Sequence, residues 1–194
     1  MLVLAVLLAC AATVPPAGGR LSALADLRFR VIGLLAVALA VQVLILTLLA
    51  GGDSTLLGVI HVATFLTAGA FILANHHIPG VLLLGLGGAL NATAIIANGG
   101  VMPARAGALE AAGRPVAEPG FRNSAAVADP HLPWLGDTFA IPSGVPLANV
   151  FSIGDVVLVL GVLWLLHVAC GSRLGRIGRG DGLDGGRPSD APAR

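Results

Sequence analysis

Residues Val150–Cys170 read VFSIGDVVLVLGVLWLLHVAC, and this stretch decides the fold class. As an α-helix with a rise of about 1.5 Å per residue, it is long enough to cross the hydrocarbon core of a bilayer, about 30 Å thick. It contains one carboxylate, Asp155, near its N-terminal end. A charge at the centre of such a span costs roughly 2.5–3.5 kcal/mol on insertion scales, and less near an end. We therefore expect Asp155 to face a protein interior or a water-filled cavity, which makes it a candidate functional residue.

The composition of the whole chain is typical of a membrane protein. Of its 194 residues, 56% are hydrophobic and 11% are charged, and the mean hydropathy is +0.92. Soluble domains carry about 25% charged residues. The formal net charge is +1, and basic patches interleaved with aromatic residues are missing, so we predict no nucleic-acid partner. The isolated cysteines Cys10 and Cys170 do not form a ligand set, and we predict neither a metal nor a cofactor.

Five apolar stretches predict an all-α bundle of five transmembrane helices. The stretches cover residues 1–14, 31–49, 56–74, 78–97 and 150–170. The first is short, so it needs a thinned bilayer or burial among its neighbours. It also lacks the basic start of a secretory signal, and we expect it to be retained as a span.

The positions of the arginines predict the orientation of these spans. Cytoplasmic loops of membrane proteins carry an excess of basic residues. Arginines cluster between the first two stretches and after the fifth, at Arg20, Arg28, Arg30, Arg173, Arg176 and Arg179. The connection at 51–55 has none. We therefore predict an inner-membrane protein with its N-terminus outside and its C-terminus inside, followed by a disordered cytoplasmic tail at 176–194.

A long outer loop, residues 98–149, joins the fourth and fifth stretches. Pro103 suits the first position of a helix and predicts a short one at 104–112. The rest is rich in Gly and Pro, and we expect it to be irregular. Three apolar side chains of the loop are expected at the membrane interface; they are Trp134, Leu135 and Phe139.

The fourth stretch carries small residues at a four-residue spacing, which predicts a close contact between helices. They lie on two neighbouring faces, Gly85, Ala89, Thr93 and Ala97 on one, and Gly80, Leu84, Gly88 and Ala92 on the other. Two polar residues lie inside the spans, His61 in the third and Asn91 in the fourth. Hydrogen bonds between helices explain both, while a proton relay through His61 and a substrate contact for Asn91 stay open.

Two aspartates flank the turn that leads into the last span, Asp137 and Asp155. The segment between them is rich in Pro and Gly and can fold back to bring the carboxylates together. Two close carboxylates cannot easily both ionise, so such a pair can activate water and protonate a leaving group. Alternatively, Asp155 caps or hydrogen-bonds a helix and Asp137 is a solvated loop acid. Asn98, Asn91 and Ser152 are candidates for holding a substrate beside the pair.

Three segments carry a resemblance over roughly residues 1–175. They are Asn98-Gly99-Gly100-Val101-Met102-Pro103, Leu135-Gly136-Asp137 and Val150-Phe151-Ser152-Ile153-Gly154-Asp155. With these segments the chain resembles an uncharacterised family of bacterial multi-pass membrane proteins, domain of unknown function 5317. The resemblance implies a bacterial membrane protein and brings no established activity.

The start of the last span and Gly87-Gly88-Ala89-Leu90-Asn91 are also similar to parts of lipoprotein signal peptidase, a membrane aspartyl protease. That family opens its last span with Phe-Asn-(apolar)-Ala-Asp, which Phe151-Ser152-Ile153-Gly154-Asp155 matches in part. The resemblance implies Asp137 as the second catalytic aspartate. Ser152 stands where the family has Asn, the Asn-x-x-Asp-Arg continuation after Asn91 is missing, and the family has four spans.

Three functions follow from these observations. The first is a non-catalytic membrane protein whose outer loop binds a partner or a lipid. The second is an aspartyl hydrolase that uses Asp137 and Asp155 on a membrane-embedded peptide or lipid substrate. The third, a small proton-coupled transporter using Asp155, His61 and Asn91, is the least favoured because five spans give no inverted repeat. Membrane lipids are the partners that all three share.

Overall fold

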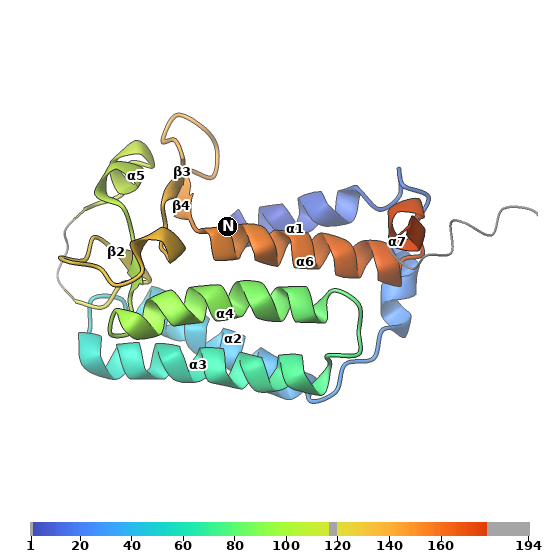
Figure 1. Cartoon of the computed structure of the whole chain (residues 1–194), viewed down its shortest axis with the longest axis horizontal. Coiled ribbons are helices and arrows are strands. Elements are labelled where there is room, and N and C mark those ends of the chain that lie inside the picture. The colour runs from blue at the N-terminus through green and yellow to red at the C-terminus, as the bar shows by residue number, and fades with distance from the viewer. Residues whose placement is uncertain (1, 117–119, 178–194) are drawn as a thin grey trace, which may run out of the picture.

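The structure is a computed structural model that describes residues 2–116 and 120–177. It is mostly helical, with apolar helices side by side and the short strands gathered at one end (Figure 1). The apolar helices are α1 (Leu2–Ala12), α2 (Ile32–Val43) with its π-helical continuation η2 (Leu44–Leu48), α3 (Ser54–Ala74), α4 (Val81–Ala97) and α6 (Ile153–Ala169). A 3-10 helix η1 (Leu21–Asp26) follows α1, and the short helix α7 (Arg173–Ile177) follows α6.

These helices are mostly shorter than the apolar stretches that predict them. Within the described residues, one helix, at Thr55–Ala74, is long and apolar enough to cross a membrane, and the other apolar helices have 10–17 residues. The fifth stretch loses its first residues because Val150 and Phe151 belong to a strand and Ser152 caps the helix. The fourth loses Ile78–Gly80 to the turn after α3.

Helices α4 and α6 are in very close contact because glycines line their interface. A Cβ placed on Gly87 would lie 2.7 Å from the Gly154 carbonyl oxygen, and one on Gly161 would lie 2.8 Å from the Leu84 amide nitrogen. The predicted close contact is therefore present, and Gly80 takes part in it, since a Cβ there would lie 2.6 Å from the Leu165 amide nitrogen. Gly85, on the other predicted face, packs closely on Ile72 of α3. The prediction is wrong for Gly88, where a Cβ would meet nothing within 4 Å.

The helices of the bundle expose many large apolar side chains, and several polar side chains are buried beside an apolar core. Large apolar side chains on α1, α2, α3, α4 and α6 are exposed, among them Leu8, Val37, Leu66, Leu82 and Leu160. The buried polar side chains of the described residues are His61, Thr64, Asn75, Asn91, Asp137, Ser152, His167 and Ser172. Charged side chains are absent from this buried set apart from the carboxyl of Asp137 and the two imidazoles.

Residues 98–116 and 120–152, called the cap below, form a small folded unit at one end of the bundle (Figure 1). Strand β1 (Met102–Pro103) pairs in parallel with β2 (Ser124–Ala125), and β3 (Phe139–Ile141) pairs antiparallel with β4 (Asn149–Phe151). Between them lie α5 (Ala106–Ala111) and the 3-10 helix η3 (Pro133–Leu135). The cap has its own small apolar core, made of Ala104, Ala108, Leu109, Ala112 and Val150.

The cap confirms one prediction and corrects two. A short helix follows Pro103, as predicted, although it begins at Ala106. The expected irregular chain is wrong where the strand pairs form. Leu135 is 3% exposed and packs against Ile95 and Met102, so it is a core residue and not an interfacial one, whereas Trp134 and Phe139 are exposed.

Buried side-chain hydrogen bonds tie the opposite end of the bundle together. His167 of α6 lies 2.8 Å (Nδ1) from the Ser172 hydroxyl and 3.0 Å (Nε2) from the Thr13 hydroxyl, which links α1, α6 and the start of α7. The side chain of Asn75, at the end of α3, bonds the backbone of Arg30 twice. Its Oδ1 accepts from the Arg30 amide, and its Nδ2 donates to the Arg30 carbonyl. Of the tail predicted to be disordered, residues 176 and 177 belong to α7, and the rest lies outside the described residues.

Candidate functional site

Asp155 lies in a capping box at the start of α6. The Asp155 amide donates to the Ser152 hydroxyl at 3.0 Å, and the Ser152 amide donates to Asp155 Oδ2 at 2.9 Å. Such reciprocal bonds satisfy amides that the first helical turn leaves without a partner. The carboxylate also lies at the positive end of the helix dipole, which stabilises its charge.

Asn91 of α4 completes this cluster from the neighbouring helix. Its Nδ2 donates to Asp155 Oδ1 at 2.8 Å, and its Oδ1 accepts from the Ser152 hydroxyl at 2.8 Å. Asn91 is 8% exposed and Ser152 is fully buried. Gly154 makes room for the amide, since a Cβ there would lie 1.9 Å from Asn91 Oδ1. The predicted residues Asn91, Ser152 and Asp155 are therefore brought together, in what we call the α4–α6 cluster.

The proton count in the α4–α6 cluster shows what it can do chemically. The Ser152 hydroxyl has one proton and two acceptors within reach, Asn91 Oδ1 at 2.8 Å and Asp155 Oδ2 at 3.0 Å. Asp155 accepts at both carboxylate oxygens. A carboxylate with both oxygens already hydrogen-bonded is well suited to fixing a helix interface, and less suited to activating water.

Asp137 reaches its position through backbone pairing with the end of β1 and the two residues that follow it. Its amide donates to the Pro103 carbonyl at 2.9 Å, and its carbonyl accepts from the Arg105 amide at 3.0 Å. Two residues later β3 begins, and Phe139 pairs with Phe151 of β4, whose rings stack. Because Ser152 follows Phe151 directly, this antiparallel hairpin brings Asp137 back towards the start of α6.

The Asp137 side chain is buried, with 4% of its surface exposed, and the Ser124 hydroxyl of β2 donates to its Oδ2 at 2.5 Å. Burial raises the pKa of this carboxyl to about 6, the hydrogen bond from Ser124 lowers it, and the negative charge of Asp155 adds a smaller upward push. The expectation of a solvated loop acid is therefore wrong for Asp137, because the cap folds over it.

The two aspartates are thus electrostatic neighbours with separate hydrogen-bond partners. Asp137 is bonded to Ser124, and Asp155 to Asn91 and Ser152. The charge of Asp155 nevertheless acts on Asp137. The arrangement supplies one weak acid that titrates near neutral pH and one anchored carboxylate.

Asn98 and His61 lie apart from the α4–α6 cluster. Asn98, at the end of α4, donates to the His131 carbonyl at 2.8 Å and accepts from the His131 amide at 2.9 Å, so it holds a loop of the cap. His61 is 1% exposed and lies 3.0 Å (Nδ1) from the Gly100 carbonyl oxygen. Both residues therefore link the bundle to the cap, and neither contacts the two aspartates directly in these hydrogen bonds.

Metal ligation has no candidate cluster in the part of the chain that the structure describes. No group of three or more His, Cys, Asp or Glu side chains is placed there so that it could hold an ion. The buried cysteines Cys10 and Cys170 are both free.

With this geometry in place, comparison with known proteins identifies the family. Residues 26–167 match a family described as a family of unknown function, DUF5317. The chain belongs to this family. The matched segment contains both aspartates, the α4–α6 cluster and the whole cap. No curated protein and no solved structure matches the chain, and the resemblance to lipoprotein signal peptidase is not shown by these comparisons.

Sequence reasoning missed Ser124 and the role of Gly154. A signal for the capping box is present, because Ser152-Ile153-Gly154-Asp155 has an acid three residues after a serine directly before an apolar run. No comparable local signal identifies Ser124, which reaches Asp137 only through the parallel pairing of β1 and β2.

Proposed function

We propose that this member of the family is an integral protein of the bacterial inner membrane, with five spans, an outer N-terminus and an inner C-terminus. In this proposal the cap lies at the outer membrane face and binds a partner or lipid there. The α4–α6 cluster serves to fix the cap on the bundle.

The observation that carries the membrane proposal is the large number of exposed apolar side chains on the bundle. Exposed apolar side chains cover all five apolar helices, with Leu8 62%, Val37 61%, Leu66 66%, Leu82 60% and Leu160 51% exposed. Contiguous exposed apolar surface of this kind is rare on soluble monomers. Inside the bundle, the buried side chains of His61, Asn91 and His167 each have a hydrogen-bond partner. Polar groups in hydrocarbon need such partners.

Helix length is compatible with this proposal although only α3 is long. Helices of 17 residues extend about 25 Å at 1.5 Å per residue, which is a few ångströms short of the hydrocarbon core. Local thinning of the bilayer accommodates such a mismatch at modest cost. The shortest, α1, packs against α6 and has Cys10 and Val14 buried at its C-terminal side.

A topology experiment tests this proposal. In a Cys10→Ala, Cys170→Ala background, Val145→Cys places one thiol in the cap and Asp26→Cys places one in η1, both at exposed positions. Membrane fractions resistant to alkaline carbonate should retain the protein. An impermeant maleimide should label Val145→Cys in intact spheroplasts and Asp26→Cys only after permeabilisation. Release by carbonate, or the opposite labelling pattern, would refute the proposal.

An aspartyl hydrolase is the second candidate, and one observation favours it. A carboxyl whose pKa is raised to about 6, beside a second carboxylate, is the kind of pair that can act as acid and base. The hydrogen bonds that already occupy both oxygens of Asp155 weigh against it.

A fluorogenic lipopeptide assay tests the hydrolase, because such an enzyme should lose cleavage in Asp137→Asn but keep it in Asp129→Asn. Asp129 is an exposed cap acid with a positive φ that asparagine accepts. Equal cleavage in the two variants, or none by the parent protein, would exclude this hydrolase.

A further inference from the structure

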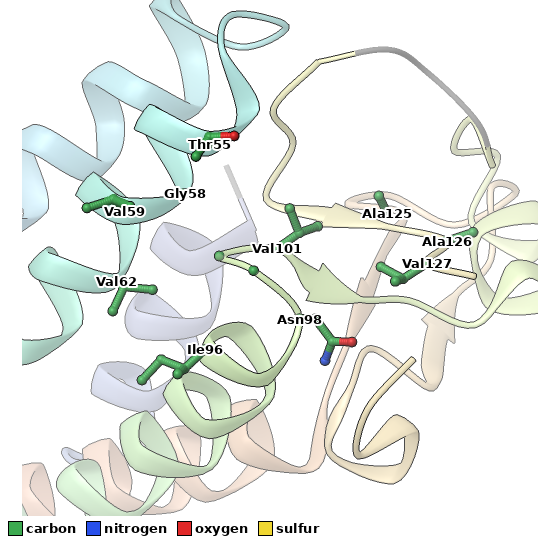
Figure 2. A pocket seen from close by; sticks show the side chains of 12 residues that line it. Thr55, Gly58, Val59, Val62, Ile96, Asn98, Val101, Ala125, Ala126 and Val127 are labelled. Carbon is green, nitrogen blue, oxygen red and sulfur yellow. The ribbon is translucent and has the colours of Figure 1, made fainter. Parts of the chain in front are cut away.

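A cleft of about 740 Å³ lies where the cap meets the bundle. Figure 2 shows its walls, with Thr55, Val59 and Val62 from α3, Ile96 and Asn98 from α4 and the following turn, and Val101 with Ala125 to Val127 from the cap. Apolar side chains dominate this lining. The volume falls within the range of small-molecule sites, roughly 300–1,000 Å³.

The cleft is continuous with the apolar outer surface of the bundle. Val59 and Ile96 line it and are 64% and 50% exposed. Leu66, two turns after Val59 on α3, belongs to the same exposed apolar surface and is 66% exposed. An occupant that covers Leu66 in the membrane can therefore enter the cleft sideways, and in a bilayer that occupant is an acyl chain.

The floor of the cleft is preformed by tight backbone packing. Gly100 has a φ of +95°, and a Cβ on it would lie 2.4 Å from the Gly58 Cα atom. His61 fixes this turn from beneath through the Gly100 carbonyl oxygen, and its ring packs edge-on against Phe121. A rigid floor reduces the ordering cost of binding.

A second cleft, of about 520 Å³, adjoins the first, because Ala126 and Val127 line both. Its lining adds Arg105 and Trp134, both exposed. Within the described residues, no acidic side chain is paired with the Arg105 guanidinium. A tryptophan suits the headgroup level of a membrane, and an arginine suits a phosphate.

We propose that these two clefts together bind one anionic phospholipid of the outer leaflet, with an acyl chain along Val59 and Ile96 and the phosphate at Arg105. This inference rests on the proposed membrane location and names the ligand of the cap. The occupant is a lipid because the apolar cleft opens towards the lipid-facing surface and the cationic one adjoins it.

Lipid binding by the purified full-length protein tests the proposal. Native mass spectrometry would follow titration with phosphatidylglycerol and with phosphatidylcholine of identical chains. We expect one phosphatidylglycerol per protein. Val59→Trp, which fills the cleft mouth, should weaken that binding about tenfold, while Leu82→Trp, at an exposed position near the other end of α4, should not change it. A second variant, Val127→Phe, narrows the cleft from the cap side and should weaken binding in the same way. It replaces Val59→Trp in the test if Val59→Trp does not fold.

The headgroup contact has its own matched pair of variants. Arg105→Gln should remove the preference for phosphatidylglycerol over phosphatidylcholine, while Arg114→Gln, with the same charge change elsewhere in the cap, should keep it. Equal binding by Val59→Trp and Leu82→Trp, competition by soluble glycerol phosphate alone, or no bound lipid would overturn the proposal. If the protein resists carbonate extraction and gives any of these results, the lipid proposal fails while the proposed membrane location stands. Failure of the membrane location would instead be seen as release by carbonate.

Discussion

Asp155 and Asp137 lie at the two ends of one hairpin, yet their surroundings are opposite. Asp155 is half-buried at a helix N-terminus and accepts hydrogen bonds at both oxygens. Asp137 is more deeply buried and one serine hydroxyl donates to it. The aspartate that is conspicuous in the sequence is therefore the one with more hydrogen bonds, and burial raises the pKa of the loop aspartate.

The largest effect on stability should come from a substitution that crowds the hydrogen-bond partners of Asp155. Gly154→Ala would place a Cβ 1.9 Å from Asn91 Oδ1, so the α4–α6 cluster cannot form without moving a helix. We expect a loss of about 3 kcal/mol or more in the free energy of unfolding, seen as little folded protein after detergent extraction. Gly88→Ala on α4, which has open space, is the matched control and should fold normally. Equal yields of the two variants would contradict the close contact.

Asp137→Asn should have the next largest effect, and of opposite sign. A carboxyl whose folded-state pKa is about 6, against about 3.9 when unfolded, favours the folded state most at low pH. Stability then falls as the pH rises from about 4 to 6, by about 3 kcal/mol in total, and stays level above. The asparagine variant should therefore melt higher than the parent at pH 7.5 and equally at pH 4, measured by circular dichroism in detergent.

Asp129→Asn is the control for that change, because Asp129 is an exposed acid of the same cap. It should leave the pH dependence of melting as in the parent protein. An unchanged pH profile in Asp137→Asn would mean that Asp137 is not the group responsible.

Asp155→Asn should destabilise the protein by about 2 kcal/mol at neutral pH. Asp155 accepts from Asn91 at one oxygen and from Ser152 at the other, so an amide NH₂ in either place would face a donor. The melting temperature should fall, in contrast to the rise in Asp137→Asn. A variant that melts like the parent protein would show that the capping box contributes little.

The smallest effect is expected for Ser124→Ala. The Ser124 hydroxyl lowers the pKa of Asp137, so its removal should raise that pKa further above 6 at a stability cost of about 1 kcal/mol. Ser143→Ala in the exposed turn of the hairpin is the control. The midpoint of the pH-dependent melting should move upwards in Ser124→Ala alone. A midpoint that moves downwards would mean that the hydroxyl does not favour the ionised carboxyl.

The apolar runs of the sequence predicted where the long helices lie, because these helices are apolar along most of their length. They could not predict the helix ends, since Val150 and Phe151 are equally apolar in strand β4 and in a helix. The cap escaped prediction because strands of two or three residues carry too short a pattern.

The candidate site was predictable in part. Asn91, Ser152 and Asp155 were each identified as polar residues in apolar surroundings, but their contact depends on the α4–α6 crossing, which glycine spacing alone does not fix. Asn98 was expected beside them as part of the same polar site, yet it bonds the loop at His131. The burial of Asp137 follows only from the cap folding over it.

Infrared titration of the carboxyl groups tests the difference between the two aspartates most directly. Spectra of the reconstituted protein between pH 4.5 and 8, with Asp137→Asn as reference, isolate the protonated carboxyl band of Asp137. We predict a band that disappears with a midpoint near pH 6 and is missing in Asp137→Asn. A titrating band that persists in Asp137→Asn and is lost in Asp155→Asn would contradict it, because the anchored carboxylate would then be the acid.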